Sequence, residues 1–179
     1  MKFRELTEND IEVRVQSVKK NGLVLLLYKN ARVDMNILDE TVGAANWQRE
    51  HYECKGNLFC RVGIRTCIKD NEAGAEWVWK SDCGTESNTE AQKGEASDSF
   101  KRACFNWGIG RELYTSPFIW VPADKCNINE AKNKEGKTIY QCYDRFSVEK
   151  IIIEDKQIKA LAIKNDTLKK RCYVWQQEQ

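Results

Sequence analysis

Positively charged side chains recur at even spacing on one face of a strand predicted over residues 58–69. Alternate residues of an extended strand face opposite sides of its sheet, so Arg61, Arg65 and Lys69 share a face with Phe59. The opposite face is mostly apolar and is predicted to be core. Evenly spaced cations beside an aromatic ring can follow a phosphate backbone, although the solvated face of an antiparallel sheet has the same pattern.

A second set of cations lies on a helix predicted over residues 89–107. Apolar residues recur every three or four positions there and predict a buried stripe: Ala96, Phe100, Ala103, Cys104 and Trp107. At about 100° per residue, Lys101 lies beside this stripe, Arg102 lies nearly opposite it, and Lys93 stands near the start of the helix. Each could bind phosphate. Alternatively, Lys101 is simply solvated and Arg102 pairs with Asp98 one turn away, for a few tenths of a kcal/mol.

Arg14 interrupts an otherwise apolar alternation in a strand predicted over residues 11–18. Its side chain points away from Val13 and Val15, and an arginine in such a strand needs a partner or a groove. Glu12, a carboxylate elsewhere or an external phosphate could serve, and the sequence leaves these alternatives open.

Aromatic residues could add stacking surfaces for nucleobases. The chain has six tryptophans, six tyrosines and six phenylalanines. Tyr52 and Phe59 are the better candidates for exposed rings. Four of the tryptophans are expected in the core: Trp47, Trp77, Trp79 and Trp107.

Catalytic arrangements find little support. His51 is the only histidine. No Ser-His-Asp arrangement can be argued from it, and we expect a solvated or core histidine. The glycines at 108 and 110 follow a helix instead of preceding one, which is typical of a helix cap and not of a phosphate loop. Asp34, Asp39 and Glu40 lie close in sequence and leave a metal-dependent nuclease open as an alternative.

Metal and disulfide sites are not expected. The eight cysteines include no CxxC pair, and paired ligand spacing is what a structural zinc site requires. Several cysteines fall inside predicted strands or a helix, and no secretory signal is evident in the first ten residues. We therefore expect reduced thiols in a cytoplasmic protein with no cofactor.

The composition is that of a globular protein whose bulk charge does not select a partner. The chain has 179 residues with 41% hydrophobic and 31% charged residues and a net charge of +2. Any nucleic-acid site must then come from local clustering of cations. No apolar run is long enough to cross a bilayer, so no membrane association is expected.

The order of predicted elements indicates an α+β fold with an antiparallel sheet covered on one face by a long helix. The elements are strands at 11–18 and 23–28, a helix at 31–42, strands at 47–54, 58–69 and 77–82, a helix at 89–107, and a hairpin of strands at 139–154 and 157–163. A basic tail follows at 164–171. Pro117 and Pro122 suggest a core domain over residues 1–121, a loop over 122–139 and a terminal hairpin with its tail over 140–179.

The stretch from Gly94 to Tyr114, GEASDSFKRACFNWGIGRELY, resembles the signature helix of the Rad fifty-two/Rad twenty-two family. Its phage-encoded relatives, the Sak-type single-strand annealing proteins, are more similar still. Segments 10–14, 28–48 and 58–65 agree with the family in order and spacing, so the resemblance covers about residues 5–121. The segment 143–147, YDRFS, resembles the tail of phage and prophage members.

The resemblance implies a homo-oligomeric ring built on a β-β-β-α core. It also implies a positively charged groove that holds single-stranded DNA by its phosphates, with the bases free to pair and with no nucleotide hydrolysis. The inner-groove cations correspond to Arg14, Lys93, Lys101 and Arg102. The expected function is annealing of complementary strands in recombination and repair, without enzymatic activity and with a single-strand-binding protein as a candidate partner. Two alternatives stay open: a metal-dependent nuclease and a ring-forming interaction module.

Overall fold

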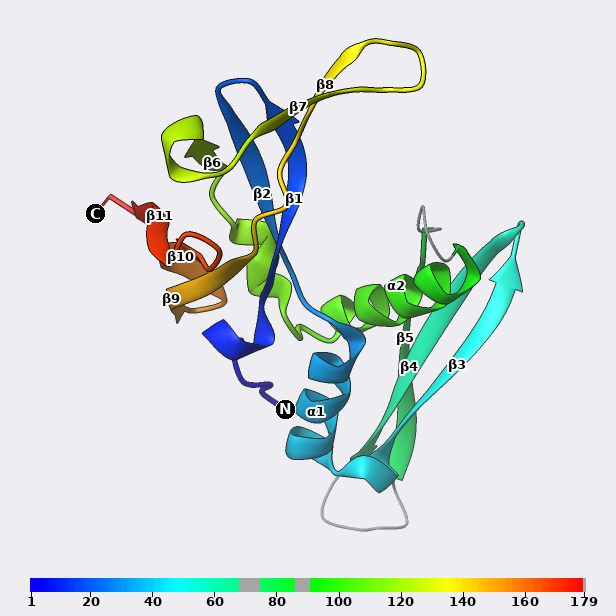
Figure 1. Cartoon of the computed structure of the whole chain (residues 1–179). Helices are drawn as coiled ribbons and strands as arrows, with labels where there is room; N and C mark the ends of the chain where they lie inside the picture. The colour runs from blue at the N-terminus through cyan, green and yellow to red at the C-terminus, as the bar shows by residue number, and fades with distance from the viewer. Residues whose placement is uncertain (68–74, 86–90, 179) are drawn as a thin grey trace. The chain divides into compact units, whose positions relative to one another are not determined.

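The computed structural model describes residues 1–67, 75–85 and 91–178. The predictions for Lys69 and for helical residues 89–90 lie outside this range. The described chain is an α+β fold of antiparallel sheets with two α-helices (Figure 1). It divides into two compact units, one formed by residues 1–4 and 30–111 and the other by residues 5–29 and 112–179. The functional division at residue 121 stays a prediction.

The first unit contains a three-stranded antiparallel meander, as the sequence predicts. Its strands are β3 (Trp47–Cys54), β4 (Asn57–Cys67) and β5 (Ala75–Cys83), with β4 in the middle. The β3–β4 turn is tight, because Lys55 and Gly56 both adopt positive φ. The register pairs Val62 of β4 with Arg49 of β3 and with Lys80 of β5.

One face of this meander is covered by α2 (Ala91–Asn106), which packs on β4 and β5. Cys60 and Val62 are fully buried on the sheet side, and Phe100 and Cys104 are fully buried on the helix side. The two periodicities, two along the strand and about 3.6 along the helix, therefore meet in one core. We call the face that α2 covers the inner face of the sheet and the opposite one the outer face.

The helix α1 (Ala31–Val42) has the limits that the sequence predicts. The Asn30 side-chain oxygen accepts hydrogen bonds from the backbone N–H of Arg32 at 2.9 Å and of Val33 at 3.3 Å, which is the usual role of an N-cap asparagine. Gly43 follows the last turn with φ 84°, a conformation that favours glycine.

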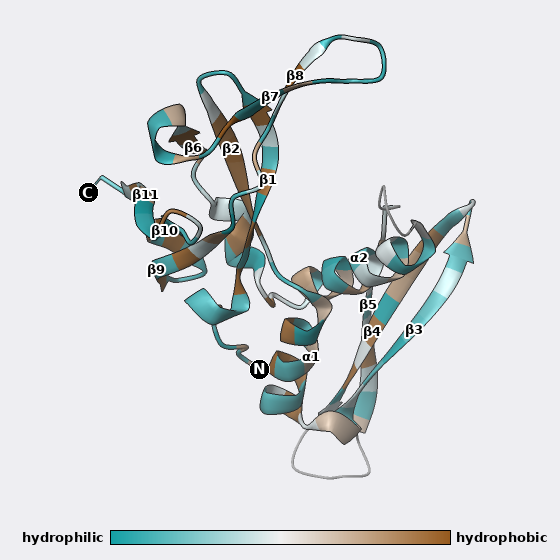
Figure 2. Ribbon diagram, in the orientation of Figure 1, coloured by the Kyte–Doolittle hydropathy of each residue, from teal (hydrophilic) through white to brown (hydrophobic). Residues whose placement is uncertain are grey.

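The second unit is built on a six-stranded antiparallel sheet with the order β11-β10-β9-β1-β2-β6. Its strands are β1 (Glu12–Lys19), β2 (Gly22–Tyr28), β6 (Ile119–Pro122), β9 (Phe146–Glu154), β10 (Gln157–Asn165) and β11 (Lys170–Gln176). The apolar β2 is coloured as hydrophobic along most of its length (Figure 2). The two end strands also approach each other, since the Tyr173 hydroxyl donates a hydrogen bond to the carbonyl of Phe118 at 3.1 Å.

Three predictions for this unit are wrong. The strand expected over 139–154 is two strands, β8 (Thr138–Gln141) and β9, and β8 pairs with β7 (Asn129–Lys132) inside the expected loop. The extended strand is interrupted between β8 and β9, at residues 142–145. Within this segment, the Asp144 carboxylate accepts hydrogen bonds from the Asn127 N–H at 2.8 Å and the Asn165 amide at 2.7 Å. Burial raises the pKa of Asp144, but these hydrogen bonds outweigh it and leave the pKa below its usual value.

The basic tail expected over 164–171 is in fact the end of β10, a turn and the start of strand β11, so the terminal hairpin is a three-stranded element. Lysines and arginines at 169–171 hide the strand in the sequence. Its alternation becomes visible only in the sheet, where Cys172 is buried and Arg171 pairs with Glu149 on β9, two strands away.

Candidate nucleic-acid interface

The α2 cations that the sequence singles out are held by carboxylates of their own unit. The Lys101 Nζ lies 3.7 Å from an Asp98 oxygen, and the Arg102 Nε lies 3.4 Å from an oxygen of Asp82 on β5. Arg102 thus has a partner on the sheet, Asp82, while Asp98, the alternative partner one turn away, lies against Lys101. Lys93 is exposed in the first turns of α2. All three predicted helix cations thus belong to one element.

Packing on the inner face fixes how α2 presents these cations. Phe100 is fully buried and stacks with Trp47 at a centroid distance of 6.1 Å. The Trp107 indole N–H donates to the backbone carbonyl of Val62 at 3.0 Å. The His51 ring nitrogen lies 3.1 Å from the carbonyl of Ala96. With one side of the helix held in this way, its flank and outer side carry Lys101 and Arg102.

Two further cations lie against α2 and were missed by sequence reasoning. The Arg49 guanidinium lies 4.7 Å from the Phe100 ring centroid, and the Lys80 Nζ lies 4.6 Å from that of Trp107. Lys80 also donates to the carbonyl of Asn106 at 2.8 Å, where a cation stabilises the end of a helix. The alternation of side chains along the strands could have revealed them. Both residues fall on the core-facing register of their strands, where a charged side chain needs a specific partner.

The two β4 arginines, in contrast, lie on the outer face. Alternation directs Arg61 and Arg65 away from Val62 and from α2. The Arg61 guanidinium pairs with Glu50 at 2.6 Å and lies 4.6 Å from the Trp79 ring centroid. The five predicted site residues of this unit therefore do not form a single surface.

Arg14 belongs to the other unit, on β1. Its guanidinium lies 2.6 Å from a Glu12 carboxylate oxygen and 5.0 Å from the Tyr28 ring centroid, and its side chain is 60% exposed. Of the partners that the sequence leaves open, Glu12 contacts Arg14 in the structure. An exposed ion pair of this kind contributes little stability.

Most of these elements fall within a match to a known protein family. Residues 3–135 match the model of the Rad52/22 family of double-strand break repair proteins. The chain belongs to this family. No curated protein and no solved structure matches it.

Membership in the Rad52/22 family places the chain among DNA repair and recombination proteins, a family whose members are annealing proteins and not classical enzymes. The matched residues include α1, the meander β3–β5 and α2, and they end before β8 and the strands β9–β11. The family resemblance expected from the helix motif is therefore confirmed, and the candidate cations all lie within the match.

The carboxylates that left a nuclease open are engaged separately in this Rad52/22 family chain. Asp34 is fully buried, Asp39 accepts a hydrogen bond from the Trp47 indole at 2.6 Å, and Glu40 pairs with Arg4 at 2.7 Å. Within the described ranges, no group of three or more His, Cys, Asp or Glu side chains could hold a metal ion.

The glycine-containing segment after α2 is a helix cap, as the sequence predicts. Its backbone N–H groups turn back onto the helix, from Gly108 to the Phe105 carbonyl at 2.9 Å and from Ile109 to the Cys104 carbonyl at 3.1 Å. These donors are engaged within the chain, which is the arrangement of a C-terminal helix cap.

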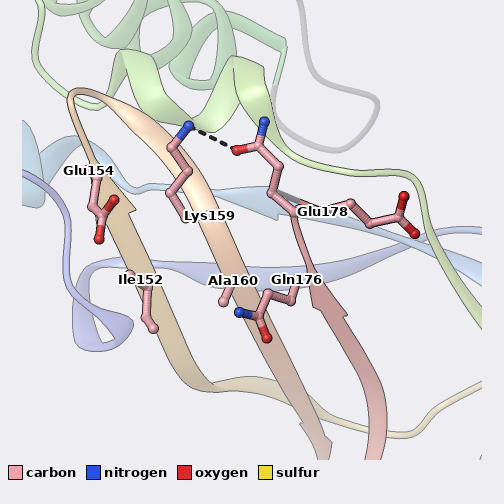
Figure 3. Close-up of a pocket in the computed structure, with 7 residues that line it drawn as sticks. Ile152, Glu154, Lys159, Ala160, Gln176 and Glu178 are labelled. Atoms are coloured by element: carbon pink, nitrogen blue, oxygen red, sulfur yellow. Dashed lines mark hydrogen bonds between the residues drawn. The ribbon is translucent and has the colours of Figure 1, made fainter.

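A surface pocket of about 430 Å³ lies in the second unit, on the strands β9, β10 and β11 (Figure 3). Its lining mixes apolar, amide and charged side chains: Ile152, Glu154, Lys159, Ala160, Gln176, Gln177 and Glu178. The Lys159 Nζ donates to the side-chain oxygens of Gln157 and Gln177, each at 2.8 Å. None of the predicted DNA-binding residues lines this pocket.

The cysteines whose side chains the structure describes are free thiols. Burial raises the pKa of Cys60, Cys126 and Cys172 to about 11 each, so these thiols stay protonated and unreactive near neutral pH. Separately, no helix in the described part of the chain is long and apolar enough to span a membrane.

Proposed function

We propose that this chain binds single-stranded DNA through the cations of α2 and promotes annealing of complementary strands in recombination and repair, without nucleotide hydrolysis. The observation that carries the proposal is the placement of Lys101 and Arg102. They are adjacent on a helix whose opposite side is buried, they lie within the family match, and their partners are carboxylates that are themselves partly exposed.

The existing ion pairs are compatible with phosphate binding on energetic grounds. Ion pairs at a protein surface contribute about 0–1 kcal/mol. Arginine and lysine form short, charge-assisted bonds with phosphate, and counterions released from the nucleic acid add to the gain. A phosphate can therefore replace Asp82 at Arg102 and Asp98 at Lys101 at small cost.

Annealing follows if the protein holds the sugar-phosphate backbone of the DNA and leaves the bases unbound. Contacts to phosphate carry no sequence information, so such a site accepts any strand and leaves its pairing edges available. Holding one strand in place reduces the orientational cost of meeting its complement. No covalent bond is made or broken, so neither a nucleotide nor a catalytic group is required.

Self-association extends this mechanism. Each subunit supplies only a few phosphate contacts, and we propose a homo-oligomeric ring that repeats them along one strand. Arg14 and Lys93 complete the proposed phosphate contacts of each subunit. The similarity of the α2 motif to Sak-type phage annealases supports that subtype within the family, and a single-strand-binding protein is a proposed partner that presents the strands.

Replacing Lys101 and Arg102 together with alanine should weaken single-strand binding and reduce its salt dependence. On single strands each phosphate contact contributes about 0.7 to the log–log salt slope, so losing two contacts should reduce the slope by about 1.4 per bound subunit. The measurement is fluorescence anisotropy of a labelled oligothymidylate across a range of salt concentrations.

The matched control is Lys19→Ala with Lys20→Ala, two adjacent exposed lysines on and after β1. It removes the same charge, so a general effect of net charge would lower binding equally in both double variants. The proposal is wrong if the α2 variant keeps the affinity and the slope of the wild type.

A further inference from the structure

The outer face of the meander carries aromatic rings at two places. Tyr52 of β3 and Phe59 of β4 are register partners and stack at 5.6 Å between centroids. The ring centroids of Trp77 and Trp79 on β5 lie 6.1 Å apart. Tyr52 is 37% and Trp77 is 38% exposed. The expectation that Trp77 and Trp79 belong to the core is wrong, because their register partners Arg65 and Gly63 place them on the face opposite α2.

Gly63 makes this arrangement sterically feasible. A Cβ at this position would lie 2.8 Å from two ring atoms of Trp79, closer than any real Cβ contact. The indole therefore lies directly over the Gly63 backbone. The Arg61 guanidinium lies 4.6 Å from the centroid of the same ring, within the range of a cation–π contact.

Rings and cations alternate along β4 on this face. The order is the Phe59 ring, the Arg61 guanidinium, the Trp79 ring over Gly63 and then Arg65, whose register partner on β5 is Trp77. A single strand of nucleic acid presents the same two chemistries in alternation, a flat base and a phosphate.

The strand register also shows which other residues lie on the outer face. The remaining positions whose side chains are described are Gln48, Glu50, Cys54, Asn57, Ala75, Ser81 and Cys83. The face thus has two guanidinium groups against one carboxylate and no Leu, Ile, Val or Met. A face of rings and cations without large aliphatic side chains suits base stacking and phosphate contact better than a protein–protein core.

In Figure 1, α2 lies along one face of the β3–β5 sheet, and among the described elements of this unit none covers the other. We propose that the outer face is a second single-stranded nucleic-acid contact. In it, Tyr52, Phe59, Trp77 and Trp79 stack on bases while Arg61 and Arg65 hold phosphates. This inference rests on the proposed function, since it assumes that single strands are the ligand, but it adds a contact to bases that the α2 cations do not make.

The test compares two probes that share a backbone and differ in their bases. An oligothymidylate and an abasic oligomer of the same length are titrated into the wild type and into the Tyr52→Ala/Trp77→Ala double variant. Stacking should make the wild type bind the oligothymidylate about tenfold more tightly than the abasic strand. The double variant should bind both probes alike, at the affinity that the wild type has for the abasic strand.

Two control variants make the result specific. Phe118→Ala removes a 72% exposed ring of the other unit and should keep the full preference for bases. Trp77→Phe keeps a ring on the outer face and should retain most of it. Lys101→Ala/Arg102→Ala should weaken the binding of both probes while the ratio between them stays near tenfold.

The outcomes separate this inference from the proposed function. Equal binding of the two probes by the wild type overturns the stacking site and leaves the α2 phosphate site in place. A base preference that survives in the double variant also overturns it, because the bases would then stack elsewhere. If the wild type binds neither probe, both proposals fall.

Discussion

Replacing Phe100 with alanine should lower the free energy of unfolding of the unit that carries α2 by about 4 kcal/mol. The ring is fully buried. It stacks with Trp47, and the Arg49 guanidinium lies 4.7 Å from its centroid. Truncation removes all of these contacts and leaves a cavity between α2 and the sheet. Urea denaturation followed by tryptophan fluorescence measures the loss, since Trp47 reports directly on this site.

The control for Phe100 is the same substitution at Phe118. That ring is 72% exposed, so its removal should change the free energy of unfolding by less than about 0.5 kcal/mol. A similar small effect at Phe100 would mean that α2 is not anchored by this ring, and the presentation of Lys101 and Arg102 would need another cause.

Replacing Gly84 with alanine should destabilise the same unit by about 3 kcal/mol. Gly84 follows β5 and lies against the backbone of α2. An added Cβ would lie 2.2 Å from the Glu95 carbonyl oxygen and 2.8 Å from the Ser99 nitrogen. Both are backbone atoms, so the helix itself must shift away from the strand. Thermal unfolding by circular dichroism should show a lower midpoint, and single-strand binding should weaken because α2 moves.

Gly56 in the β3–β4 turn provides a contrast. An added Cβ there meets nothing within 4 Å, but the residue has φ +75°. Alanine should cost about 1 kcal/mol through backbone strain alone and should leave DNA binding unchanged. If Gly84→Ala were no more destabilising than Gly56→Ala, the close approach of β5 and α2 would be wrong.

The elements of the α2 unit were predictable because their signals are local. Asn30 and Gly43 limit α1 by capping chemistry, and alternation along β4 separates Cys60 and Val62 from Arg61. Neither signal depends on knowing a distant partner. The same reasoning placed Lys101 beside the buried stripe of α2 and Arg102 nearly opposite it.

The remaining features depend on contacts between distant segments. Asp82 became the partner of Arg102 only through the docking of β5 on α2, which intrahelical spacing could not show. Trp77 and Trp79 lie outward because of their register with β4, whereas their size alone suggested a core position. Strand β11 was hidden because its cations resemble a solvated tail until Glu149 and β10 stand beside it.

A strand-annealing reaction measures directly whether the α2 cations promote pairing of complementary strands. Two complementary labelled strands are mixed with the protein and Mg²⁺, and duplex formation is followed in time while strand length is read on a denaturing gel. We expect faster duplex formation with both strands intact, loss of the acceleration in Lys101→Ala/Arg102→Ala, and retention of it in Lys19→Ala/Lys20→Ala. Shortened strands, or equal acceleration by both double variants, would contradict this mechanism.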